Sequence, residues 1–169
     1  TACVTCNVRE IIVNVVEIHF RFKFLVGRTC KEVQAAILLT KLKHINEYLV
    51  RRKEIAQLYN VLLSETTLKL PYVAPDCKHA YYLYVVRHKR RDEIIRKLKE
   101  HGIQLNVSYP WPIHQMPAYK DTSKVSGTLQ VTERMANEIF SLPMYPSLTN
   151  DEVCLVCDKL KQILKEINS

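Results

Sequence analysis

Residues 31–63 contain neither proline nor glycine, and this long uninterrupted stretch constrains the fold more than any other feature of the chain. Side chains recur there at roughly the three- and four-residue spacing of one helix face, with Lys, Arg and Glu between them. They are Val33, Ala36, Ile37, Thr40, Leu42, Ile45, Leu49, Ile55, Leu58, Tyr59 and Leu62. The spacing predicts one long helix. A domain of ordinary size can bury only part of such a helix, so we expect the remainder to pack on another domain or subunit.

Downstream of this stretch, strand-like and helix-like patterns alternate. Residues 80–86 combine aromatic with β-branched side chains, which favours a strand, and Gly102 is placed to cap a helix C-terminus. Thr149 and Glu152 have the spacing of a capping box, which predicts a helix start. The expected elements are strands at residues 80–86 and 103–107 and helices at residues 91–101, 131–140 and 149–167. This order predicts an α+β fold in which helices cover a small sheet.

The first residues of the chain differ from the rest. Apolar and polar side chains alternate over residues 18–24, which is typical of a half-buried strand. The chain begins with threonine, which indicates a fragment. We therefore divide the sequence into an atypical N-terminal segment, residues 1–24, and a domain over residues 25–169.

The net charge of +8 and the isoelectric point near 9.2 raise the question of an anionic partner. Nucleic acid, an anionic membrane surface and a phosphorylated small molecule all qualify. The basic clusters at residues 51–53 and 87–91 lie beside amphipathic helical patterns, so a solvated helix face accounts for most of this charge. The sequence has no apolar run of membrane-spanning length, no convincing secretory signal and no Gly-rich phosphate-binding motif. We expect a cytoplasmic protein with no nucleic-acid and no membrane partner.

Two Cys-x-x-Cys pairs, Cys3/Cys6 and Cys154/Cys157, resemble the thiolate set of a structural zinc site. The second pair lies inside a predicted helix, where Cys157 shares the core-facing spacing of its apolar neighbours. Cysteine buries readily as a small apolar side chain. We therefore interpret Cys157 as part of the core and expect no metal site.

Residues 109–119 hold three prolines and are expected to form an irregular loop. Tyr109, Trp111, His114 and Tyr119 give this loop an unusual concentration of aromatic and titratable groups. Loops of this kind often form binding sites. From residue types alone, a binding site and a packed loop are equally good interpretations.

Five segments of the chain form a recognisable series. The long helical stretch carries EVQAAI (residues 32–37), Leu42, Arg51-Arg52, Ile55-Ala56 and Tyr59-Asn60. HAYYLYVVR (residues 79–87), Arg91-Asp92 with Leu98 and Gly102-Ile103, SYPWPIH (residues 108–114) and SLPMYPSL (residues 141–148) follow. In this order, over about residues 25–167, the series resembles the DegT/DnrJ/EryC1/StrS sugar aminotransferase family.

The resemblance implies the C-terminal small domain of a fold-type I aminotransferase that depends on pyridoxal phosphate, with a small sheet covered by helices and a long helix before it. It further implies a homodimer that transfers an amino group from glutamate to a nucleotide-linked keto-deoxysugar. The SYPWPIH loop is most similar to enzymes acting on dTDP-keto-6-deoxyhexoses, at the 3-position. By the same resemblance, Tyr109, Trp111, His114 and Tyr119 line the sugar-nucleotide site of the complete dimer by stacking and hydrogen bonding.

The family's catalytic groups lie upstream of everything matched here. Its cofactor-binding lysine sits in a Ser-x-His-x-x-Lys pattern, and Lys23 lacks that context. We assign no catalytic residue and expect a chain that is inactive alone and does not bind pyridoxal phosphate covalently. The family's asparagine, which reaches the partner subunit's cofactor phosphate, aligns with Gly27, and its arginine aligns with Thr29. Because glycine cannot supply an amide hydrogen bond, we interpret the sequence before Cys30 as an out-of-frame remnant, a degraded gene or a divergent junction.

Two other classes of function compete with the aminotransferase fragment. A basic nucleic-acid-binding protein would use the charged helices and exposed tyrosines. A non-catalytic module would dimerise with full-length aminotransferases through the long helix.

Overall fold

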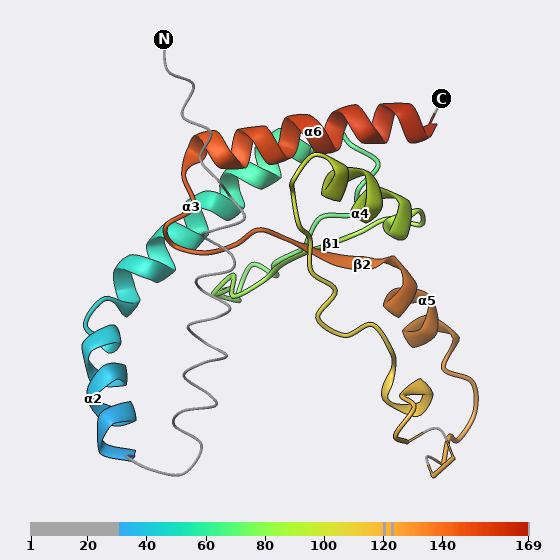
Figure 1. Cartoon of the computed structure of the whole chain (residues 1–169), viewed down its shortest axis with the longest axis horizontal. Helices are drawn as coiled ribbons and strands as arrows, with labels where there is room; N and C mark the ends of the chain where they lie inside the picture. The colour runs from blue at the N-terminus through green and yellow to red at the C-terminus, as the bar shows by residue number, and fades with distance from the viewer. Residues whose placement is uncertain (1–30, 120, 123, 169) are drawn as a thin grey trace. The chain divides into compact units, whose positions relative to one another are not determined.

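The computed structural model describes residues 31–119, 121–122 and 124–168 (Figure 1). By its contacts the chain divides into two units, Thr1–Tyr48 and Leu49–Ser169. The elements run in the order α2 (Lys31–Leu42), α3 (Ile45–Leu63), β1 (Tyr84–Arg87), α4 (Arg91–Glu100), η1 (Ile113–Gln115), α5 (Gln130–Glu138), β2 (Ile139–Leu142) and α6 (Asn150–Asn168). Helices thus accompany one small two-stranded antiparallel sheet, in agreement with the predicted α+β class. The predicted strand at residues 18–24 and the predicted boundary after residue 24 lie outside the described residues.

The prediction of a single helix over residues 31–63 is wrong at Lys43 and His44, which form a turn between α2 and α3. The amide of His44 donates to the carbonyl of Lys41 over 3.1 Å, a bond that spans three residues and tightens the helix end. The His44 imidazole also lies 3.3 Å from the Glu47 carboxylate. The sequence gives no Pro or Gly signal for this break, which is why spacing alone missed it.

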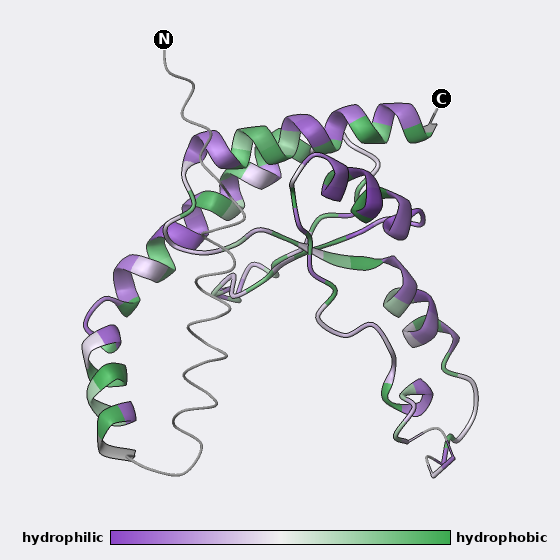
Figure 2. Ribbon diagram, in the orientation of Figure 1, coloured by the Kyte–Doolittle hydropathy of each residue, from purple (hydrophilic) through white to green (hydrophobic). Residues whose placement is uncertain are grey.

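In the first unit, α2 leaves large apolar side chains exposed. Leu38, Leu39 and Leu42 are each more than 60% exposed, and Figure 2 shows hydrophobic residues along much of this helix. Part of the long helical stretch is therefore left without a core around it, as its length predicted. Packing of this part on another domain or subunit stays a prediction.

The core of the second unit forms where α3, α4, α6 and the sheet contribute fully buried side chains. The sheet register pairs Tyr84 with Leu142 at one end and Arg87 with Ile139 at the other. The largest side chains that the core buries completely are Tyr59, Tyr84, Phe140, Ile55, Leu63, Ile94, Leu98, Leu160 and Ile163. Tyr59 also donates its hydroxyl to the carbonyl of Pro143 over 2.9 Å, which satisfies the polar end of a buried ring.

The structure corrects three of the predicted elements. Residues 103–107 form no strand, because their described pairing is a single bridge between Asn106 and Ser141. The predicted helix over residues 131–140 ends at Glu138, and Ile139 and Phe140 begin β2 instead. The predicted strand at residues 80–86 forms only from Tyr84 onwards.

The two predicted signals for helix ends, the capping box at Thr149 and the C-terminal glycine at Gly102, are confirmed. The amide of Thr149 donates to the Glu152 carboxylate over 2.8 Å, and the amide of Glu152 donates to the Thr149 hydroxyl over 3.2 Å, which is the predicted capping box. Gly102 follows α4 with a φ of +77°, a left-handed conformation that glycine adopts without a Cβ clash.

The solvated-face interpretation of residues 51–53 is wrong for Arg51 and Arg52. Arg51 donates to the carbonyl of Leu148 over 2.7 Å and to the side-chain oxygen of Asn150 over 2.8 Å, which joins α3 to the start of α6. Nη1 of Arg52 lies 3.0–3.1 Å from three backbone carbonyl oxygens. Both guanidinium groups therefore bind the backbone of distant segments.

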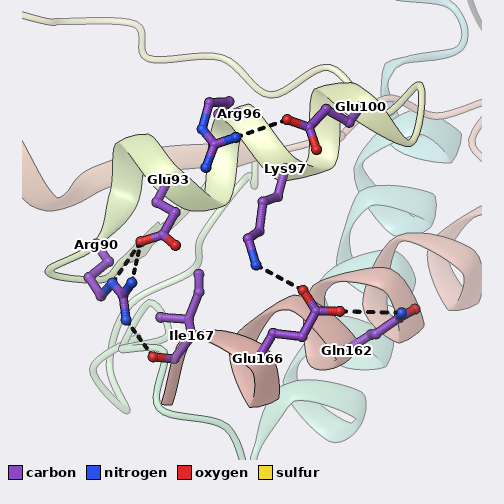
Figure 3. A network of polar contacts seen from close by, with 8 residues as sticks. All are labelled: Arg90, Glu93, Arg96, Lys97, Glu100, Gln162, Glu166 and Ile167. Carbon is purple, nitrogen blue, oxygen red and sulfur yellow. Dashed lines mark hydrogen bonds and ion pairs between the residues drawn. The ribbon is translucent and has the colours of Figure 1, made fainter. Parts of the chain in front are cut away.

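Three basic side chains at or on α4 are paired with carboxylates, as Figure 3 shows: Arg90, which precedes the helix, Arg96 and Lys97. Lys97 contacts Glu166 of α6 over 2.8 Å, and the hydrogen bond from Lys97 is the main cause that lowers the pKa of Glu166. Exposed ion pairs of this kind stabilise a fold only slightly. Their consequence here is electrostatic, because each pair offsets one positive charge on this face.

Candidate functional site

The four predicted site residues lie on one loop that follows the bridge at Asn106. That bridge ties the loop's start to β2, where the amide of Ser141 donates to the carbonyl of Asn106 over 2.8 Å. The loop then passes through the short 3-10 helix η1, a piece of regular structure that its prolines did not predict. The amide of Met116 donates to the carbonyl of Ile113 over 3.2 Å and closes this turn.

The aromatic rings of this loop face solvent. Tyr109 is 71% exposed, and Trp111 and Tyr119 are each 53% exposed. Within the described part of the chain, no ring contact joins these three side chains. The structure therefore places them on one surface segment without assembling them into a closed pocket.

His114 differs from these aromatic residues. Its side chain is only 15% exposed, and its Nε2 lies 2.9 Å from Oε1 of Glu133 in the first turn of α5. Sequence reasoning missed Glu133, because no motif or helical spacing links two residues 19 positions apart. Only the folded chain brings the imidazole and this carboxylate together.

A protein-family model matches residues 25–161, and its description is the DegT/DnrJ/EryC1/StrS aminotransferase family. This match covers most of the chain. The chain belongs to that family.

Among curated relatives, this member of the family is 46% identical over 138 residues to the dTDP-3-amino-3,4,6-trideoxy-alpha-D-glucose transaminase of Micromonospora megalomicea subsp. nigra. The alignment covers 79% of this chain and 37% of the relative. Among solved structures, DesV of S. venezuelae superposes with a TM-score of 0.72 at 34% identity, covering 76% of this chain and 35% of DesV. The PMP form of Spr1654, a sugar aminotransferase from Streptococcus pneumoniae, gives a TM-score of 0.65 at 23% identity, with 76% and 34% covered, which shows a shared fold. The chain thus spans little more than a third of these proteins.

Family membership implies pyridoxal phosphate, and the candidate loop can be tested for the groups that this cofactor needs. A pyridoxal enzyme requires a lysine amine for attachment and a carboxylate opposite the pyridinium nitrogen. Residues 103–119 contain no lysine, aspartate or glutamate. Elsewhere in the described chain, lysines such as Lys97 and Lys161 lie on helix surfaces, at least partly exposed. The described residues therefore do not fit covalent attachment of the cofactor, and Lys23, Gly27 and Thr29 lie outside them.

The second Cys-x-x-Cys pair places one of its two thiols in the core. Cys157 is fully buried on α6, as predicted, and this burial raises the pKa of its thiol to about 12. Within the described residues, no group of three or more Cys, His, Asp or Glu side chains is arranged to hold a metal ion. Cys3 and Cys6 lie outside those residues.

The described helices also include none that is long and apolar enough to cross a membrane.

We expect iodoacetamide at about pH 8 to alkylate the exposed Cys77 and to spare Cys157 in the native chain. Alkylation requires the thiolate, and a pKa raised to about 12 leaves Cys157 protonated at that pH. Peptide mass spectrometry after timed labelling measures both sites in one sample. Labelling in urea serves as the control, because unfolding should make the two rates similar. Equal rates in the native chain would contradict the burial of Cys157.

Proposed function

We propose that this chain is the C-terminal part of an aminotransferase that transfers an amino group from glutamate to a nucleotide-linked keto-deoxysugar. The observation that carries the proposal is the family match over residues 25–161, together with 46% identity to a transaminase named for a dTDP-amino-trideoxyglucose. The narrower substrate, a dTDP-keto-6-deoxyhexose aminated at the 3-position, rests on that name and on the SYPWPIH loop.

In this proposal the loop residues bind the nucleotide sugar. Tyr109, Trp111 and Tyr119 present exposed aromatic faces, which suit stacking on a base or a sugar ring. His114 supplies a hydrogen bond from a side chain whose Nε2 lies 2.9 Å from the Glu133 carboxylate. None of the four is assigned a role in moving the proton of the reaction.

We further propose that the chain does not catalyse transamination alone. Its candidate loop carries no lysine and no carboxylate, and the chain spans 37% of the relative named above. In the complete enzyme, a homodimer, pyridoxal phosphate supplies the amino-group chemistry, and the residues described here contribute substrate contacts.

One observation favours a second candidate, the non-catalytic module that pairs with a longer aminotransferase. Leu38, Leu39 and Leu42 form an exposed apolar face on α2, and such faces commonly mark protein contacts. The nucleic-acid alternative has less support, because carboxylates offset part of the basic charge on α4, as in the Arg96–Glu100 pair.

The proposal predicts that the purified chain binds a dTDP-sugar but does not turn it over with glutamate. Calorimetry should detect binding, and replacing His114 with alanine should weaken it roughly tenfold, the cost of one well-placed hydrogen bond. His101→Ala is the control, because His101 is an exposed residue at the C-terminus of α4.

Two outcomes would contradict this assignment. Absence of dTDP-sugar binding would remove the substrate role of the loop. After addition of pyridoxal phosphate, a new absorbance band that survives dialysis and disappears on borohydride reduction would show covalent attachment. Turnover by such material would end the claim of inactivity.

A further inference from the structure

Short-range hydrogen bonds shape the candidate loop around His114. Its described backbone hydrogen bonds join residues three positions apart, as in the bond from the Gln115 amide to the Pro112 carbonyl over 2.9 Å. Bonds of this range shape a turn but do not fix the turn relative to the core. The contact between His114 and Glu133 joins residues 19 positions apart and therefore can.

Glu133 lies on an element that is firmly attached to the core. Its helix, α5, continues without a loop into β2, which pairs with β1. Ala136 of α5 is buried, and its carbonyl accepts a hydrogen bond from Arg91 of α4. The Glu138 carboxylate at the end of α5 contacts Arg87 of β1 over 3.1 Å. The Glu133 carboxylate thus connects the His114 imidazole to the sheet.

The atoms in contact also determine the form of the imidazole. A carboxylate accepts hydrogen bonds, so the nitrogen that faces Glu133, Nε2 of His114, must carry a hydrogen. In neutral histidine, a partner on one ring nitrogen selects the tautomer and sets the orientation of the ring. A ring fixed before a ligand arrives loses less conformational freedom on binding.

We infer that Glu133 is a positioning residue, which holds His114 in the Nε2–H form and in one orientation for the nucleotide sugar. This inference rests on the proposed function for its ligand. Its structural half, the fixed tautomer, can be measured in the free chain. Glu133 itself is assigned no contact with the substrate.

The test combines a spectroscopic and a binding measurement on the full 169-residue chain. Long-range ¹H–¹⁵N spectra of the histidine side chains, with His114 assigned through a His114→Gln variant, should show an Nε2–H pattern in the wild type. Glu133→Ala should convert this pattern to a mixture of tautomers and weaken dTDP-sugar binding roughly tenfold, because a ring that is not held in one form loses more conformational freedom on binding. Glu133→Gln keeps an oxygen acceptor of equal reach, so it should retain the pattern and lose less affinity.

The chain offers a matched control in Glu47, whose carboxylate lies 3.3 Å from Nδ1 of His44. Glu47→Ala removes a carboxylate–histidine contact that belongs to the first unit and not to the candidate loop, and we expect it to alter the His44 signals without changing dTDP-sugar binding. An unchanged His114 spectrum in Glu133→Ala overturns the inference, and so does a changed spectrum with unchanged affinity. If the wild-type chain binds no dTDP-sugar, the proposed function fails, and the spectrum alone then decides whether Glu133 fixes His114. If Glu133→Ala does not fold, Glu133→Gln is compared with Glu133→Asp instead, because the shorter aspartate side chain withdraws the oxygen from His114. Identical His114 spectra and identical dTDP-sugar binding in these two variants would overturn the inference.

Discussion

Leu160→Ala is expected to lower the free energy of unfolding by about 2–5 kcal/mol, the usual cost of truncating a fully buried leucine. Leu160 is completely buried on α6 and belongs to the main core cluster. The substitution removes apolar contacts and leaves a cavity that the surrounding helices fill only in part. Urea unfolding followed by circular dichroism measures the change.

The same helix supplies the control for this experiment. Leu155 is 51% exposed, so Leu155→Ala makes the identical chemical change on the outer face of α6. We expect its effect to stay within about 0.5 kcal/mol. Similar losses for the two variants would mean that α6 does not bury the face described here. A large difference would show that the second unit forms its core without the rest of an aminotransferase.

The reliability of the sequence predictions followed the range of the interactions involved. Helix ends with local signals were located well, because Gly102 and the Thr149–Glu152 pair act within one turn of chain. The first two residues of β2, Ile139 and Phe140, were mistaken for helix, since two apolar residues in succession fit either period. This segment is a strand because it pairs with β1, which lies more than 50 residues away in the chain. The local spacing of apolar residues does not indicate such a distant partner.

In the candidate site too, local features were predictable from the sequence and long-range contacts were not. Prolines and aromatic residues in one short stretch were sufficient to select Tyr109, Trp111 and His114, since composition is local. Composition did not identify the carboxylate of Glu133, because its contact with His114 forms only in the folded chain. Likewise, Arg52 resembled one solvated charge among several until the fold placed backbone carbonyls around it.

Arg52→Met is expected to lower the free energy of unfolding by about 2–4 kcal/mol, because it leaves several carbonyls without their charged donor. Nη1 of Arg52 lies 3.0 Å from the carbonyl oxygen of Tyr81, 3.1 Å from that of Tyr82 and 3.1 Å from that of Met144. One nitrogen shares its hydrogens among these three acceptors, so the loss should be smaller than three independent bonds would give. Methionine keeps much of the side-chain length and removes the donor together with its charge. Urea unfolding again provides the measurement.

The backbone at Tyr81 is the reason why we expect the Arg52 guanidinium to stabilise the fold more than an ordinary surface ion pair does. Tyr81 has a φ of +48°, a left-handed conformation that costs a residue with a Cβ about 1–2 kcal/mol, and the amide of Tyr81 donates to the His79 imidazole over 2.8 Å. Arg52 binds the carbonyl of the same residue, so the backbone amide and the backbone carbonyl of the strained Tyr81 both have a hydrogen-bond partner. Arg52→Lys should recover part of the stability, because an ammonium keeps the charge but lacks the planar fork. Lys53→Met, on an exposed position of the same helix, should stay within about 0.5 kcal/mol, and an equal loss there would assign the effect to net charge instead of to these carbonyls.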